Sequence, residues 1–154
     1  MLKHLQGWGV LKFTKTDIYT SIIEDEETLR EEGKDTARYL AAGAGKVIWV
    51  RSPHKCHDDD ADLEEALLLA VSKLSRLPGI LVEGNSAIEL LKPDIVIFIS
   101  AKHIKNTALR VLDMAHAVLG EDPEQAERGN KKRIRFDHEE RCAEYILRLV
   151  HERL

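Results

Sequence analysis

The sequence has only two cysteines among its 154 residues, Cys56 and Cys142. Two thiols so far apart do not provide the dense disulfide framework that is typical of small secreted domains. No apolar run approaches the roughly 20 residues that a membrane helix needs, and the first residues lack the pattern of a secretory signal. These absences predict a cytoplasmic protein with reduced thiols and no membrane partner.

An excess of positive charge is also absent. The 23 Lys and Arg residues are outnumbered by 27 Asp and Glu residues, which gives a net charge of −4 at pH 7. This balance argues against non-specific electrostatic binding of the whole protein to nucleic acid or to an anionic membrane. The 44% of hydrophobic residues is too high for a disordered chain. The length predicts a single domain over residues 1–154, large enough to bury a core.

Short apolar runs alternate with helical patterns along the chain. The runs that predict buried strands are rich in β-branched residues and cover residues 10–13, 47–50, 80–82, 95–99 and 134–136. Helices are predicted, from apolar spacing of three and four, over residues 36–42, 62–77, 87–91, 107–119 and 139–154. The polar segment 121–132 is predicted as a loop. This order predicts an α/β fold in three layers, with an open, mostly parallel sheet and helices on both faces.

The beginning of the sequence resembles the end of a helix over residues 2–6, terminated by Gly7 and leading into the first strand. An α/β sheet does not usually begin with the end of a crossover helix. We therefore expect that an upstream strand and its loop are missing from this sequence. A missing central strand would leave backbone groups and apolar surface uncovered, so we expect weak stability or self-association as a homo-oligomer.

Polar side chains follow several of the predicted strands. Lys12 stands at the end of the first strand, Glu83 ends the third, and Lys102 follows the fourth. Because the carboxyl ends of parallel strands meet at one edge of a sheet, where ligands bind, we expect these side chains to surround one ligand. Lysines and hydroxyls beside carboxylates favour an anionic, phosphorylated ligand with magnesium.

Three residues near this edge allow two interpretations each. Glu83 could hold Mg²⁺, directly or through water, or could cap the following turn. Gly84 could let a ligand or a neighbouring backbone approach closely. Asp35 could contribute to the ligand site or could be only the N-cap of a helix.

Two further motifs each have a functional and a structural interpretation. Gly43-Ala44-Gly45-Lys46 lacks the outer glycine and the Ser or Thr of a phosphate loop, and it ends a helix instead of beginning one, so we predict a helix end and a turn. His54, Cys56 and His57, followed by several aspartates, could bind a transition metal, or could form a solvent loop whose aspartates complement the next helix.

At several short segments the chain resembles the MobB-type proteins, the P-loop GTP-binding accessory factors of molybdopterin guanine dinucleotide biosynthesis. These segments are residues 33–38, 42–44, 47–50, 52–53, 80–85, 93–99 and 136–137. The resemblance implies the P-loop NTPase fold, GTP and Mg²⁺ as cofactors, and a molybdenum-cofactor nucleotidyltransferase or molybdopterin as partner. It also implies that Glu83 is a Walker-B-like acid and that Asp35 and Thr36 lie near the nucleotide or the pterin phosphate.

The sequence departs from that family in three respects. The glycine-rich phosphate loop is absent, the family's lysine–histidine pair is replaced by Lys12-Phe13, and no Asn-Lys-x-Asp motif for reading guanine is present. Without the backbone amides of a phosphate loop, we expect impaired binding of GTP and at most a weak GTPase activity.

The predicted ligand site consists of Lys12, Asp17, Asp35, Thr36, Glu83, Gly84 and Lys102. Three alternatives stay open: a non-enzymatic α/β scaffold, a metallochaperone-like protein that uses His54, Cys56 and His57, and another GTPase of the same class, such as a metal-insertion GTPase.

Overall fold

The structure is a computed structural model that describes residues 5–17, 19–53, 60–100, 108–120, 132–135 and 139–153. It divides into two compact units, an N-terminal unit that ends at Leu91 and a C-terminal unit that begins at Lys92. Each unit has its own sheet. In the described part of the chain, no helix combines the length and the apolar character needed to cross a membrane.

The N-terminal unit is built around the strand β1. Its elements are β1 (Gly9–Thr16), β2 (Ser21–Ile23), α1 (Glu26–Leu29), α2 (Asp35–Ala41), β3 (Lys46–Pro53), α3 (Asp60–Leu74), β4 (Ile80–Glu83) and α4 (Asn85–Leu91). The strand order is β2-β3-β1-β4. β1 pairs in parallel with both β3 and β4, whereas the short β2 pairs antiparallel with β3.

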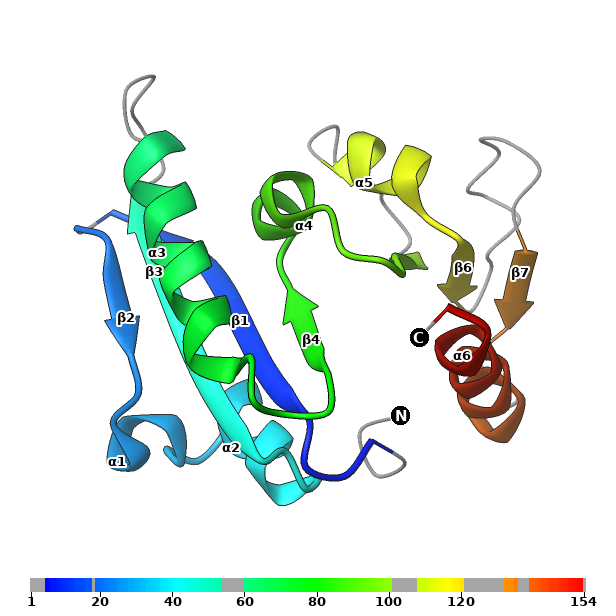
Figure 1. Cartoon of the computed structure of the whole chain (residues 1–154), viewed down its shortest axis with the longest axis horizontal. Coiled ribbons are helices and arrows are strands. Elements are labelled where there is room, and N and C mark those ends of the chain that lie inside the picture. The colour runs from blue at the N-terminus through cyan, green and yellow to red at the C-terminus, as the bar shows by residue number, and fades with distance from the viewer. Residues whose placement is uncertain are drawn as a thin grey trace. The chain divides into compact units, whose positions relative to one another are not determined.

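Both faces of this sheet are covered because alternate residues of a strand point to opposite sides. On one face, Leu11 and Ile48 pack with Leu67 of α3 and Ala87 of α4. On the other face, Val10 and its neighbours pack against α1 and α2. Figure 1 shows α3 in front of β1 and β3. The near-continuous apolar character of the strands thus results from burial on two sides, as the sequence predicted.

The C-terminal unit contains β5 (Ile97–Ser100), α5 (Leu109–Met114), β6 (Ala117–Gly120), β7 (Lys132–Arg135) and α6 (Glu139–Arg153). Its strands are parallel in the order β5-β6-β7. Leu119 of β6 packs against Cys142 and Ile146 of α6. Before β5, the amide of Val96 donates a hydrogen bond to Nδ1 of His116 at 3.1 Å, and the amide of His116 donates to the carbonyl of Val96 at 2.8 Å.

The α/β class and the mostly parallel pairing are confirmed, but four expectations differ from the structure. The helix predicted over residues 107–119 is wrong in its second half, because α5 ends at Met114 and β6 follows. Every residue of β6 is buried, and a short apolar run has no periodicity that separates a strand from a helix. Of the described N-terminal residues, 5–7 form a bend and a turn, not the end of a helix. The described strands form two sheets instead of one, and β2 and α1 were not predicted.

The Gly43–Lys46 segment ends α2, as predicted. Gly43 has a φ of +97°, its amide donates to the carbonyl of Leu40 at 3.1 Å, and the amide of Ala44 donates to the carbonyl of Tyr39 at 3.1 Å. These bonds satisfy the last carbonyls of the helix in the manner of a glycine cap. The segment leads directly into β3, so it is a turn between a helix and a strand.

Candidate functional site

The candidate site is a row of three side chains that crosses the N-terminal sheet at one register. Lys12 of β1 lies opposite Trp49 of β3 on one side and opposite Glu83 of β4 on the other. All three residues belong to the face that α2 covers, since Val47, two residues before Trp49, packs there with Val10. The row therefore has an aromatic ring at one end, a cation in the middle and a carboxylate at the other end.

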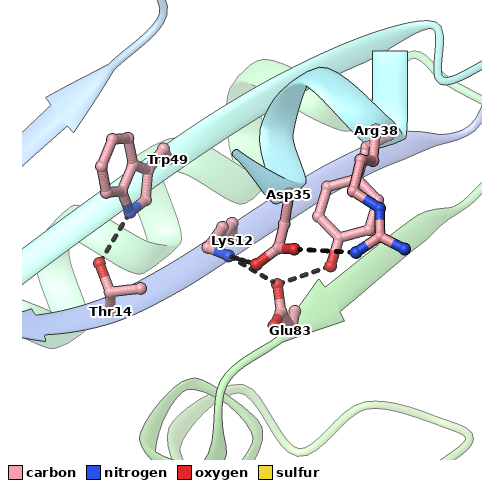
Figure 2. A network of polar contacts seen from close by, with 7 residues as sticks. Lys12, Thr14, Asp35, Arg38, Trp49 and Glu83 are labelled. Atoms are coloured by element: carbon pink, nitrogen blue, oxygen red, sulfur yellow. Dashed lines mark hydrogen bonds and ion pairs between the residues drawn. The ribbon is translucent and has the colours of Figure 1, made fainter. Parts of the chain in front are cut away.

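Lys12 is nearly buried and binds two carboxylates. Its side chain is 11% exposed, its Nζ lies 2.5 Å from Oδ2 of Asp35 and 3.4 Å from Oε2 of Glu83. Both carboxylate side chains are 45% exposed. A buried ammonium group is tolerated when opposite charges and hydrogen bonds surround it. Figure 2 shows the two acids converging on Lys12 from α2 and from β4.

Asp35 reaches Lys12 from the first turn of α2. The N-cap of this helix is Lys34, which makes no side-chain capping bond, so Asp35 is not the N-cap that the sequence left as an alternative. Its other oxygen, Oδ1, lies 3.6 Å from a guanidinium nitrogen of Arg38. The hydrogen bond from Lys12, together with its charge, lowers the pKa of the Asp35 carboxyl below its ordinary value.

Glu83 is held by a second partner, Tyr39. The hydroxyl of Tyr39 donates a hydrogen bond to Oε2 of Glu83 at 2.6 Å. Burial, followed by this hydrogen bond and the charge of Glu83, raises the pKa of the Tyr39 hydroxyl well above its usual range. Glu83 therefore faces the row across the sheet instead of capping the next turn. Tyr39 was missed in the sequence, although it lies four residues after Asp35 and so on the same side of α2.

Trp49 forms the opposite end of the row. Its indole Nε1 donates to Oγ1 of Thr14 at 2.8 Å, and Nζ of Lys34 lies 5.2 Å from the ring centroid. The guanidinium carbon of Arg51 also lies near the ring, 5.1 Å from the centroid. Cations at these distances are attracted to the face of an indole ring. Trp49 and Arg51 are not recognisable as site residues in the sequence, because an isolated tryptophan in an apolar strand has no distinguishing pattern.

The row crosses the topological switch point of the sheet, which lies between β1 and β4. β3 lies on one side of β1 and β4 on the other. The helix α2, between β1 and β3, covers one face of the sheet, and α4, which follows β4, covers the opposite face. In open α/β sheets, ligands bind beyond the carboxyl ends of the strands at such a switch point. Glu83 is the last residue of β4 at this point, and Lys12 is its register partner within β1.

The remaining predicted site residues have different surroundings. Thr36 is 1% exposed, and among the described residues its hydroxyl has no hydrogen-bond partner. Asp17 lies exposed just after β1 and is not one of the partners of Lys12. Gly84 has a φ of +133°, and a Cβ there would lie 2.9 Å from Cβ and 3.0 Å from the carbonyl oxygen of Phe13. The chain segment that approaches Gly84 closely is therefore the neighbouring strand β1.

The predicted metal loop of His54, Cys56 and His57 lies outside the described residues, as does Lys102. In the part of the chain that the structure does describe, no group of three or more His, Cys, Asp or Glu residues is placed to hold a metal ion. The metal-binding interpretation of this loop therefore stays a prediction.

The position of Lys12 along its strand differs from the prediction. The sequence placed Lys12 at the end of the first strand, but β1 continues to Thr16, and β3, which has the same length, pairs with it at every residue. Thr14 and Thr16 are β-branched and share the face of Lys12, so they continue the strand although they are polar. The strand that ends at this register is β4, whose last residue, Glu83, lies opposite Lys12.

Comparisons with known proteins add one distant similarity. No protein-family model matches the sequence, and no solved structure matches it. The chain is 28% identical over 137 residues to the gamma-glutamyl phosphate reductase of Sulfurovum sp. (strain NBC37-1), an alignment that covers 85% of this chain and 30% of that protein. The chain thus spans about 30% of the length of the curated relative it matches.

Proposed function

We propose that this chain is a MobB-like accessory protein of molybdopterin guanine dinucleotide biosynthesis, with an α/β fold of the P-loop NTPase type. The observation that carries the proposal is the ion pairing of Lys12 with both Asp35 and Glu83. These two acids belong to the separate short motifs on which the resemblance rests. Their convergence on one lysine supports the proposal, because the resemblance implies that both acids lie near the ligand.

The chemistry of the row suits a phosphorylated ligand with magnesium. Carboxylate oxygens from two different elements converge on one cation, and such oxygens are the ligands that Mg²⁺ accepts in proteins. The ammonium group of Lys12 is a natural partner for a phosphoryl oxygen. In the proposed complex, Asp35 and Glu83 would hold the magnesium that accompanies GTP, and the ammonium group of Lys12 would bind a phosphoryl oxygen.

The proposed role is that of an adaptor. Because the sequence has no phosphate-loop motif, GTP binding is expected to be weak and hydrolysis slow or absent. The chain would assist nucleotide attachment by docking on the molybdenum-cofactor nucleotidyltransferase or on molybdopterin. The Sulfurovum relative is named for a phosphorylated molecule, gamma-glutamyl phosphate, and a site for a phosphoryl group in this chain would agree with that name.

Calorimetric titration of the whole chain with GTP and Mg²⁺ tests this proposal. We expect weak binding that Glu83→Gln abolishes. Glu24→Gln is the matched control, because Glu24 forms ion pairs with Lys46 and Lys73 away from the row. Absence of heat for the wild-type protein at millimolar GTP would contradict nucleotide binding. Failure to co-elute with a purified molybdenum-cofactor nucleotidyltransferase would contradict the adaptor role.

One observation favours a second candidate, a non-enzymatic scaffold. The polar groups at the centre of the row already satisfy one another, since Lys12 has two carboxylate partners and Tyr39 donates to Glu83. A closed network of this kind also serves to fix α2 on the sheet. The scaffold predicts that Glu83→Gln reduces stability in a protein that shows no binding of nucleotide in the titration above.

A further inference from the structure

We propose that Arg51, stacked on Trp49, is a second anion-binding position that takes the terminal phosphoryl group of a phosphorylated ligand. This inference deepens the proposed function and rests on it for the identity of the ligand. It concerns the end of the row opposite Glu83, where no motif of the sequence indicated a site.

The guanidinium group of Arg51 is held in place from two sides. Its central carbon lies 5.1 Å from the centroid of Trp49, and its Nε donates to Oγ of Ser21 on β2 at 3.3 Å. The ring of Trp49 is fixed in turn by its own bond to Thr14. A planar guanidinium that is stacked and clamped at Nε loses little rotamer freedom when its two terminal nitrogens bind a ligand.

The charge of Arg51 has no carboxylate partner among the described residues. Ser21, its only hydrogen-bond partner in that part of the chain, is neutral. By contrast, Lys12 is paired with Asp35 and Glu83. Lys34 is paired as well, since its Nζ lies 2.5 Å from Oε2 of Glu31. Arg51 is half-buried, and within the described ranges its terminal nitrogens bond to no acid and no carbonyl. Such an arginine is suited to a phosphate, which it binds through two parallel N–H···O bonds.

Two neighbouring groups complete this position. Thr14 lies opposite Arg51 in the register of β1 and β3, and a hydroxyl that accepts a bond from Trp49 still has its own proton to donate. Nζ of Lys34 lies 5.2 Å from the centroid of the same indole ring. Donors from β1, β3 and the beginning of α2 thus gather around Trp49, on the same face as Lys12.

The charges along the row are therefore separated. Acids lie at the β4 end, where they suit a metal ion. The guanidinium of Arg51, which pairs with no acid in the described part of the chain, lies at the β3 end, where it suits a phosphoryl group. A diphosphate lying along the row would present its bridging metal to Asp35 and Glu83 and its free end to Arg51. The class of ligand is consequently a molecule with two or more linked phosphoryl groups, not a simple carboxylate.

Titration with inorganic pyrophosphate, without magnesium, tests the inference. In a Trp8→Phe protein, Trp49 is the only tryptophan, so its fluorescence reports on this position alone. We expect pyrophosphate to change this fluorescence and Arg51→Gln to weaken binding by roughly tenfold or more, as loss of a charged hydrogen bond does. Arg51→Lys, which keeps the charge but not the two-pronged geometry, should weaken binding less. Arg30→Gln on α1, an exposed arginine paired with Glu26, is the control and should bind normally.

The outcomes separate this inference from the proposed function. If the wild-type protein does not respond to pyrophosphate, or if Arg51→Gln and Arg51→Lys bind it like the wild type, the inference is overturned. If GTP with Mg²⁺ binds while the Arg51 variants behave normally, the proposed function stands without it. If pyrophosphate binds through Arg51 but GTP does not, the anion position stands and the nucleotide ligand is wrong.

Discussion

Lys12 and Glu83 occupy one register position on adjacent parallel strands, and Nζ of the lysine lies 3.4 Å from Oε2 of the glutamate. Backbone pairing places both residues, and the apolar neighbours of each on its strand, such as Leu11 and Val82, pack in the core. Asp35 then joins them from α2. The site is thus positioned mainly by the sheet, with one acid supplied by a helix that packs on it.

We expect replacement of Lys12 by Met to destabilise the N-terminal unit. Methionine has a similar volume, so the packing is kept, but Asp35 and Glu83 lose the lysine that lies between them. Charged hydrogen bonds contribute about 1.5–3 kcal/mol, and the partial exposure of both acids reduces this to about 1–2 kcal/mol. Urea unfolding would measure the change.

Lys73→Met is the matched control for this substitution. Lys73 forms an exposed ion pair with Glu24, so its loss should cost less than about 1 kcal/mol. Equal losses for the two variants would show that Lys12 has no special role in stability.

The contribution of Asp35 to stability should depend on pH. Its pKa is lowered from 3.8 in the folded protein, chiefly by the hydrogen bond from Lys12. The resulting stabilisation is complete at pH values well above 3.8 and is lost as the pH falls through 3.8 towards the lower folded value, because the unfolded chain then binds the proton first. The difference in unfolding free energy between wild type and Lys12→Met should therefore shrink in acid. Carbon-detected NMR titration of Asp35 should show its pKa return towards 3.8 in Lys12→Met.

Tyr39 should be the tyrosine that ionises last. Its pKa is raised from 10.0 by burial and by Glu83, so the stabilisation it gives is complete below pH 10.0 and is lost as the pH rises above that value. Of the three tyrosines, one should resist ionisation in a spectrophotometric titration of the folded protein. Tyr39→Phe should remove this late component and cost about 1 kcal/mol, the usual value for one hydrogen bond. A late component that persists in Tyr39→Phe would assign it to another residue.

Gly84 should tolerate no side chain. Its positive φ disfavours any other residue, and a Cβ would lie within 3.0 Å of Phe13 on β1. Gly33 has a φ of +84° with nothing within 4 Å of an added Cβ, so Gly33→Ala isolates the cost of the backbone conformation, about 1–2 kcal/mol. Gly84→Ala should cost clearly more, roughly 3 kcal/mol. Thermal unfolding of the two variants would compare them, and equal shifts would show that the contact with Phe13 relaxes freely.

The sequence predicted the parallel α/β layout because buried parallel strands have continuous apolar runs and stand between helices of recognisable spacing. It also predicted that Lys12, Asp35, Glu83 and Lys102 would gather around one ligand. The first three do lie together, although Lys12 stands within β1 and not at its end, and Lys102 lies outside the described residues. It did not predict β2, which has three residues and no distinctive pattern, or β6, whose apolar run continues the spacing of α5. Tyr39, Trp49 and Arg51 were missed because their roles depend on register and on β2, and neither is encoded in a local motif.

The pairing of β1 with strands far along the chain also decides the order in which the site can be completed during synthesis. Asp35 follows Lys12 by 23 residues, whereas Glu83 follows Tyr39 by 44. On the ribosome, α2 and β3 can therefore dock on β1 before β4 has been translated. Until then Lys12 has one carboxylate instead of two, and the outer backbone edge of β1 is open. The arrival of β4 closes that edge and brings Glu83 to Lys12 in one event. A nascent chain that stalls before Ile80 therefore leaves the open backbone edge of β1 accessible to chaperones and proteases.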